Sequence, residues 1–355
     1  MKRRLFLTLP AALAAQEAPI TAAVRTYLAG EMAKRKIPGL TVTVANKDRV
    51  VWEEAFGVAD RENGTPMKET ARFRLASIAK PMTAIAVLQL VERGRLKLDA
   101  DIREYVPAFP QKPHVVTVRQ LLGHLGGIRH YRPGEIESTR HYSDVMTPLA
   151  IFAGDALVHP PGTKFLYTTY GYNLLGAAVQ TASGMSYADY VRQNVLAPAG
   201  MKSVVIDDHF AIIEGRVRGY QKRKDGSVWN AALSDTSNKI PGGGWLGTAG
   251  DMVRLALAFR QCKLTTPETV TLMLRTQRTK TGAHVGYGMG WQIFRHLDPQ
   301  VPLERRIVGH TGSQPGTNTF LGMTMDAAWS VAILTNLEGA LPQTMGETVL
   351  EMLRA

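Results

Sequence analysis

The sequence predicts an α/β protein of the α+β type, in which an antiparallel sheet is flanked by an N-terminal and a C-terminal helix and carries an inserted all-α lobe. Two observations support this prediction. Strand patterns occur near the N-terminus and again in the last third of the chain, whereas the residues between them show mainly helical spacing of apolar side chains. One sheet built from both chain ends is therefore expected. The α/β lobe should comprise residues 15–75 and 206–355, and the helical lobe residues 76–205.

Residues 1–14 have the layout of a secretory signal peptide. Lys2, Arg3 and Arg4 form a basic head, and a short apolar stretch follows that ends in Ala12-Leu13-Ala14. This stretch is too short for a permanent membrane anchor. We therefore expect an exported protein, periplasmic or secreted after cleavage, and both the general and the twin-arginine export routes stay open.

The N-terminal half predicts a helix, a β-hairpin and then a series of helices. Apolar residues at helical spacing predict the first helix over residues 21–36. Runs rich in β-branched and aromatic residues at 40–45 and 50–56 predict the hairpin. Residues 77–93 are apolar on most sides, which indicates a long and largely buried helix. Further helices are expected at residues 118–125, 171–181 and 187–196.

The C-terminal part returns to strand patterns. Residues 216–222 and 227–231 flank Asp225-Gly226, a signal for a two-residue hairpin turn. Thr248 and Asp251 are spaced like a capping box at the start of a helix. Three closing strands and a last helix are expected at residues 288–294, 319–325, 329–335 and 344–353.

Composition excludes several classes of function. The 355 residues are 45% hydrophobic and 20% charged, which is typical of a globular protein with a sizeable core. The net charge is +12, but Lys and Arg are scattered and form no continuous stripe, so no nucleic-acid partner is expected. Cys262 is the single cysteine and cannot form an intrachain disulfide. We expect no cofactor.

Ser77 and Lys80 form the strongest candidate for chemistry. A serine opens the apolar helix, and a lysine three residues later shares its helix face. A serine hydroxyl needs a base to become a nucleophile, and a desolvated lysine can lose its charge and act as that base. The alternative, an N-cap serine and a surface lysine, is weakened because Lys80 has no obvious route to solvent.

Two later segments gather polar side chains at loops. Residues 161–172 place several hydroxyls at a loop-to-helix junction, where Tyr167 is a candidate proton shuttle if cationic neighbours lower the pKa of its phenol. The alternative is that these tyrosines only pack. Residues 308–316 contain small residues that leave backbone N–H groups approachable, and His310 within them is either catalytic or structural.

In this order, the three segments resemble those of the serine β-lactamases, penicillin-binding DD-peptidases and related esterases. The motif Ser77-Ile78-Ala79-Lys80 matches Ser-x-x-Lys, Tyr167-Thr168-Thr169 stands where Tyr-x-Asn is expected, and His310-Thr311-Gly312 stands where Lys-Thr-Gly or His-x-Gly is expected. The resemblance spans nearly the whole mature chain and implies the β-lactamase/transpeptidase-like fold. The stretches LLGHLGGIRHY and FLYTTYGYNLLG most resemble the mitochondrial serine β-lactamase-like branch, whose filament formation makes a filament an expectation here.

The resemblance also implies roles for individual residues. Ser77 forms the acyl-enzyme, Lys80 and Tyr167 share its proton, and the backbone N–H groups of Ser77 and Ser313 form the oxyanion hole. The remaining residues of the expected substrate-binding set are His310, Thr311, Gly312 and Thr169.

Two departures from the family pattern narrow the expected activity. Thr169 replaces an asparagine amide, and His310 replaces a lysine that would supply a fixed positive charge. We therefore expect a serine hydrolase that acts through an acyl-enzyme on amide or ester bonds of a small molecule or peptide, as a peptidase or esterase before a β-lactamase.

The sequence bears on three rival functions. An α/β-hydrolase needs a Gly-x-Ser-x-Gly elbow, which the sequence lacks. A metal-dependent hydrolase needs clustered histidines, and the spacing of His124 and His130 does not indicate a metal site, so no metal ligands are expected. The remaining rival is a non-catalytic or slowly acylated binding or filament-forming protein of the same fold. The sequence indicates no oligomeric state.

Overall fold

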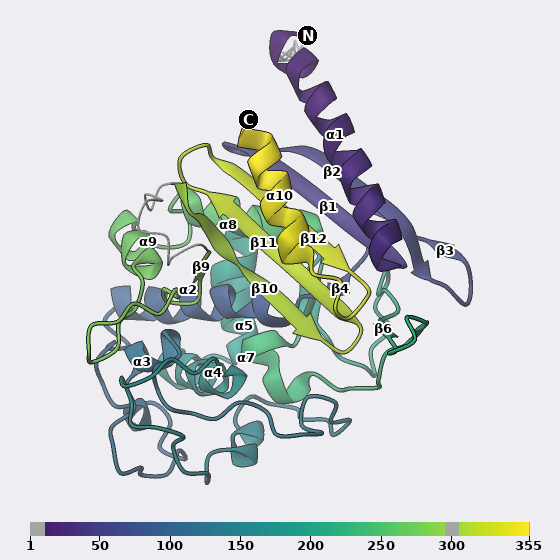
Figure 1. The fold of residues 1–355 in the computed structure, drawn as a ribbon. Coiled ribbons are helices and arrows are strands. Elements are labelled where there is room, and N and C mark those ends of the chain that lie inside the picture. The colour runs from purple at the N-terminus through teal and green to yellow at the C-terminus, as the bar shows by residue number, and fades with distance from the viewer. Residues whose placement is uncertain (1–10, 295–304, 355) are drawn as a thin grey trace, which may run out of the picture.

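The computed structural model describes residues 11–294 and 305–354, and its centre is an antiparallel sheet. In these residues seven strands follow the order β3-β2-β1-β12-β11-β10-β9 (Figure 1). From the N-terminal part come β1 (Gly39–Asn46), β2 (Arg49–Asp60) and β3 (Thr65–Pro66). From the C-terminal part come β9 (Gln292–Ile293), β10 (Ile307–Gln314), β11 (Thr317–Thr324) and β12 (Trp329–Thr335).

The two ends of the chain meet inside this sheet. Strand β1 pairs with β12 along its length, from Leu40 opposite Thr335 to Asn46 opposite Trp329. The prediction of one antiparallel sheet from both chain ends is therefore confirmed. Smaller sheets join β4 (Phe73–Arg74), β8 (Trp245–Gly247) and β5 (Val205–Ile206), and β6 (Tyr220–Lys222) with β7 (Val228–Asn230).

Helices cover both faces of the large sheet. Helices α1 (Ala11–Arg35) and α10 (Pro342–Arg354) lie together on the outer face, and α8 (Ala249–Arg260) packs on the inner face (Figure 1). Alternation along β12 explains the two layers, because Val331 and Ile333 join the core under α1 and α10. Ala332 and Leu334 join the larger inner core.

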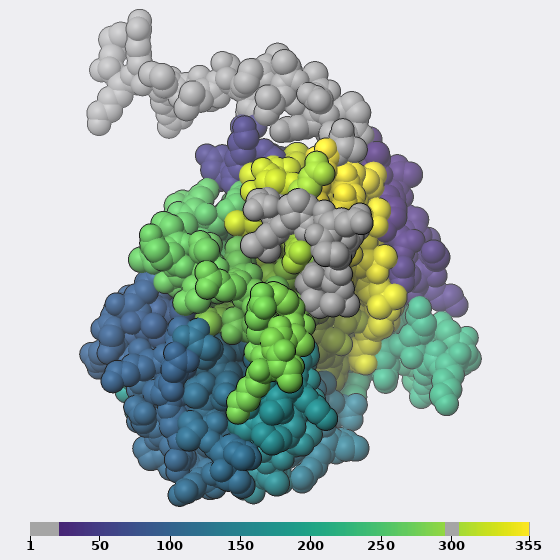
Figure 2. Space-filling view, turned by 60° about the vertical axis from the view of Figure 1, so that its left-hand side comes forward, coloured from purple at the N-terminus to yellow at the C-terminus, as the bar shows by residue number. Residues whose placement is uncertain are grey.

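The middle of the chain forms a helical lobe below the sheet. In the space-filling view its segments gather in one part of the molecule, while the two chain ends lie together in the other (Figure 2). Helix α2 (Ala79–Glu92) is buried from Ala79 to Leu90, as its apolar sequence predicts. The other helices are α3 (Val118–Leu122), α4 (Thr169–Ser183), α5 (Tyr187–Val191), α6 (Ala197–Ala199), α7 (Ile240–Gly243) and α9 (Pro267–Leu274). The short α7 packs against α2 and α4.

Several predicted boundaries differ from the structure. The helix expected at 77–93 begins as the 3₁₀ turn η1 (Ala76–Ile78), and the one expected at 187–196 continues after α5 as the π-helical η4 (Arg192–Leu196). The strand expected at 288–294 shortens to β9. Strand β10 was not predicted, because Gly309 and Gly312 lower its β-propensity.

The predicted signal segment, residues 1–14, lies largely outside the described residues, and export stays a prediction. Where the chain is described, its helices are too short or too polar to cross a membrane.

Candidate active site

Ser77 lies at a strained turn between β4 and α2. The preceding residue, Ala76, has a φ of +50°, a left-handed conformation that non-glycine residues rarely adopt. The N–H of Leu75 donates to the carbonyl oxygen of Trp245 at 2.8 Å, which holds the incoming chain against β8. The turn η1 then leads directly into α2, so the Ser77 hydroxyl stands at the start of a buried helix.

Strand β10 passes close to this turn because Gly312 has no side chain. A Cβ at Gly312 would lie 2.5 Å from the carbonyl oxygen of Leu75 and 2.2 Å from Oγ1 of Thr319. Real Cβ atoms do not approach other atoms so closely, so any larger residue would push the strand away. The glycine of the third motif thus brings Thr311 and Ser313 to Ser77.

Lys80 is fully buried and holds three polar partners. Its Nζ lies within hydrogen-bond distance of Oγ of Ser77 at 3.0 Å, of Oγ1 of Thr169 at 3.2 Å and of the carbonyl oxygen of Gly242 at 2.9 Å. Burial lowers the pKa of Lys80 well below its ordinary value of 10.5, and the charge of Lys239 lowers it further. The amine is therefore placed to accept a proton from Ser77.

Tyr167 lines the same pocket as Ser77. The Nζ of Lys80 lies 4.9 Å from the centroid of the Tyr167 ring. The condition that cationic neighbours lower its pKa is not met, since burial raises the pKa of Tyr167 above its ordinary value. Tyr167 is thus a neutral hydroxyl that can pass a proton on, and not a phenolate base.

A cavity of about 330 Å³ opens over Ser77. The predicted residues Ser77, Tyr167, Thr169, Thr311 and Ser313 line it. The other lining residues are His130, Tyr131, Ile136, Gly242, Gln292 and Gln314. Residues from all three motifs, far apart in sequence, therefore meet at one pocket.

His310 does not line this cavity, contrary to the expectation from the resemblance. The side chain is fully buried, with Nε2 2.9 Å from the hydroxyl of Tyr287 and Nδ1 2.6 Å from the carbonyl oxygen of Thr311. Burial, followed by the charge of Lys80, lowers the pKa of His310 to about 3. The imidazole is neutral at physiological pH and supplies no positive charge to the site.

Two histidines that the sequence did not place in the site support its second motif. The Nδ1 of His124 accepts from the N–H of Thr168 at 3.2 Å, and the Nδ1 of His130 accepts from the N–H of Thr169 at 3.3 Å. These bonds fix the start of α4, from which Thr169 faces Lys80. Both histidines lie in the stretch LLGHLGGIRHY, which contributed to the family resemblance. Their hydrogen bonds to residues about 40 positions away leave no local signal in the sequence.

Lys239 is a second buried lysine that sequence reasoning missed. It is 1% exposed, its Nζ donates to the carbonyl oxygen of Ile136 at 2.9 Å, and it lies 5.1 Å from the ring centroid of Tyr131. Burial lowers the pKa of Lys239 to about 7. Its position in a polar segment gives no sign of burial in the sequence.

Comparisons with known proteins identify the family of the chain. A model of the β-lactamase family matches residues 24–352. The mitochondrial serine β-lactamase-like protein LACTB of Bos taurus is 30% identical, over 80% of this chain and 68% of that protein. Esterase EstB of Burkholderia gladioli is 28% identical, over 92% of this chain and 93% of that protein.

A solved structure shows the same fold. The octameric penicillin-binding protein homologue from Pyrococcus abyssi superposes with a TM-score of 0.81 at 25% identity, covering 94% of this chain and 77% of that one. The resemblance seen in the three motifs is thereby confirmed, as is the β-lactamase/transpeptidase-like fold. The family model spans nearly the whole chain, Ser77 and Tyr167 line one cavity, and Lys80 is hydrogen-bonded to Ser77, so the chain belongs to the β-lactamase family of the serine hydrolase superfamily.

Proposed function

We propose that this protein is a serine hydrolase that forms an acyl-enzyme at Ser77 and acts on small, uncharged ester or amide substrates. The observation that carries this proposal is the 3.0 Å contact between the Ser77 hydroxyl and a fully buried Lys80 amine of lowered pKa. A lysine in that state is a base at a pH where an ordinary lysine is an acid.

The reaction follows from these contacts. The neutral amine of Lys80 takes the proton of Ser77 as Oγ bonds to the substrate's carbonyl carbon. The carbonyl electrons move to the oxygen. By the family resemblance, the backbone N–H groups of Ser77 and Ser313 stabilise the negative charge on that oxygen. When the carbonyl re-forms, the bond to the leaving group breaks, and that group takes a proton from Lys80 through the Tyr167 hydroxyl. Water then releases the acyl group by the same steps.

The cavity favours substrates without charge. Among the described residues, its lining contains no Lys, Arg, Asp or Glu. Burial, followed by the charge of Lys80, lowers the pKa of His130 to about 4, so this lining imidazole is neutral too. His310 is also neutral and lies outside the cavity lining. The cavity lining therefore offers no fixed cation for the carboxylate of a β-lactam or peptide. This supports an esterase or amidase over an antibiotic-hydrolysing enzyme.

A fluorophosphonate probe tests the nucleophile. The wild-type chain should be labelled once, and Ser77→Ala should abolish labelling. Ser143→Ala, an exposed serine outside the cavity, is the matched control and should be labelled like the wild type. Equal labelling of the Ser77→Ala variant would refute the assignment.

A substrate panel tests the preference. A p-nitrophenyl ester, a D-amino-acid peptide and nitrocefin are compared side by side, and the ester should turn over fastest. Thr169→Asn restores the amide of the second motif and should raise nitrocefin turnover relative to the ester. Nitrocefin turnover as fast as that of the ester in the wild type would overturn the preference but not the nucleophile.

A further inference from the structure

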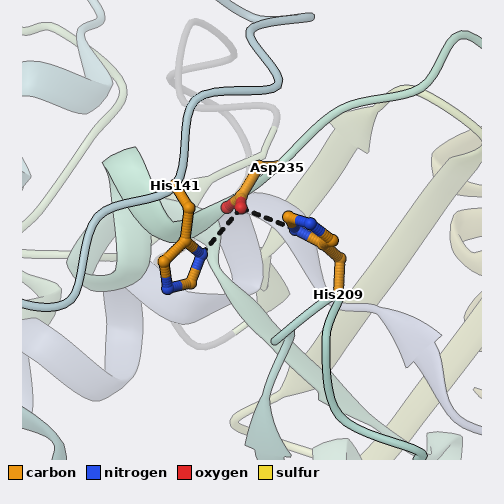
Figure 3. A group of neighbouring side chains, drawn as sticks. All are labelled: His141, His209 and Asp235. Carbon is orange, nitrogen blue, oxygen red and sulfur yellow. Dashed lines mark hydrogen bonds and ion pairs between the residues drawn. The ribbon is translucent and has the colours of Figure 1, made fainter.

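Two histidines and an aspartate converge on one point outside the serine cavity. The Nδ1 atoms of His141 and His209 lie 2.8 and 2.7 Å from the same oxygen of Asp235, Oδ2 (Figure 3). The three potential ligand atoms all lie within 4.8 Å of one another. Among the described residues, this is the one such group of His, Cys, Asp and Glu side chains.

The surrounding loops hold the group in place. The N–H of Asp235 donates to the carbonyl oxygen of Ser138 at 2.8 Å, and the N–H of Tyr142 donates to Oγ of Ser237 at 2.9 Å. His141 therefore lies on a loop that is tied to the Asp235 segment on both sides. These bonds pre-form the geometry before any ligand arrives.

Asp235 is oriented as a metal-binding carboxylate would be. Its side chain is 2% exposed, and its Oδ1 accepts from the N–H of Ser237 at 2.7 Å, which aims Oδ2 at the imidazoles. On the other side, Oγ1 of Thr236 donates to Asp207 at 3.1 Å and so links the Asp235 segment to the loop that carries His209. Such supporting hydrogen bonds are what orients the ligands of metal sites.

We propose that His141, His209 and Asp235 bind one divalent transition-metal ion, with Zn²⁺ as the best match. Two imidazole nitrogens and one carboxylate oxygen suit Zn²⁺, Co²⁺ or Ni²⁺ and disfavour Mg²⁺ and Ca²⁺, which prefer oxygen ligands. Ligands at about 2.0–2.2 Å from a tetrahedral ion lie roughly 3.3 Å apart. Each histidine nitrogen must therefore move about half an ångström away from Oδ2 of Asp235, and the two nitrogens, which now lie within 4.8 Å of each other, must settle at the same spacing. Rotation of the two partly exposed imidazole rings allows both changes.

The open side of the site leaves room for further ligands. The side chains of His141 and His209 are 35% and 40% exposed. Phe210 packs on both rings, with centroid distances of 5.1 and 3.9 Å, and forms an apolar wall on one side. His209 and Asp235 also line a neighbouring cavity of about 620 Å³. Three protein ligands leave the fourth position of the ion to water.

The ion would also steady one wall of the serine cavity, a consequence that rests on the proposed function. Ile136 lines that cavity, and Ser138, two residues further, is hydrogen-bonded to Asp235. Fixing Asp235 and His141 holds the backbone at Ser138 and at His141, directly after Ile136 in the chain. Removing the ion should therefore raise KM for the ester while kcat changes little.

Isothermal titration of the tag-free, EDTA-stripped full chain with ZnCl₂ tests the site. One Zn²⁺ should bind per chain, and His141→Gln and His209→Gln should each lower the affinity at least about 10-fold. His114→Gln, an exposed histidine elsewhere, is the matched control and should bind like the wild type. At about 100 times the Kd, Zn²⁺ should raise Tm by on the order of 4 °C.

Two results would overturn the proposal. The first is no saturable Zn²⁺ binding by the wild type, which would leave the group as a hydrogen-bond network. The second is equal binding by the wild type and both cluster variants, with folding checked by circular dichroism, which would place the ion elsewhere. Ser77→Ala should still bind Zn²⁺, so a failure of the hydrolase proposal leaves this test intact.

Discussion

Replacing the buried Lys239 with Met should change how stability depends on pH. The pKa of Lys239 is about 7 in the folded chain because of burial and, secondarily, the charge of Arg74, which the carboxylates of Asp207, Asp235 and Glu137 oppose. In the unfolded chain its pKa is about 10.5. Between these values the unfolded chain binds more protons than the folded one, so stability rises with pH.

The size of the effect follows from the two pKa values. Linkage with folded and unfolded pKa values of about 7 and 10.5 gives a cost of about 4 kcal/mol at pH 7 and about 2 kcal/mol at pH 9. Lys239→Met removes this cost, and it also leaves the carbonyl oxygen of Ile136 without its 2.9 Å donor, which costs about 1–3 kcal/mol. The variant should be about 1–3 kcal/mol more stable than the wild type at pH 7 and about equal at pH 9.

Urea unfolding in the presence of EDTA, at pH 7 and at pH 9, measures the free energy of unfolding of the wild type and of Lys239→Met. The loss of the hydrogen bond cancels in the comparison between the two pH values, so the advantage of Lys239→Met should shrink by about 2 kcal/mol. Lys263→Met, at an exposed lysine, is the matched control. Its free energy of unfolding should depend on pH in the same way as that of the wild type. A Lys239→Met curve that also runs parallel would refute the reasoning. Since the charge of Lys239 lowers the pKa of Lys80, its removal should also move the rising limb of ester hydrolysis to higher pH.

Three further substitutions test the site. Lys80→Met should slow acylation by about 10²–10⁴-fold in a stopped-flow ester assay. The fold should stay intact, because the variant no longer has an amine to bury away from water. Full activity would exclude Lys80 as the base. Tyr167→Phe keeps the ring that packs 4.4 Å from His124, and it should lower kcat with little change in KM, whereas a change in KM alone would contradict a proton relay. Gly312→Ala should lower thermal stability by about 1–3 kcal/mol together with activity. Gly30→Ala, in α1 with nothing within 4 Å, should instead be neutral or stabilising, and similar melting curves for the two would contradict the packing argument.

Local patterns predicted most of the framework. The hairpin of β1 and β2 follows from runs rich in β-branched and aromatic residues, a pattern that the chain carries within a few residues. The strand β12 was predicted over its whole length as well. The buried helix α2 follows from apolar residues on most of its sides. Strand β10 escaped prediction because Gly312 serves the close approach to the Ser77 turn and Gly309 the close approach to β11, and neither glycine contributes strand propensity.

The sequence by itself determined the family, the spacing of Ser77 and Lys80 on one helix face, and the order of the three motifs. Only the tertiary structure decided which distant groups meet them, such as the carbonyl oxygen of Gly242 at Lys80 and the imidazole of His130 at Thr169. The tertiary structure also buries the side chain of His310 and places His141 and His209 next to Asp235. The physical reason is that periodicity encodes which face of an element is buried, whereas partners and desolvation, and with them each pKa, depend on how separate elements pack.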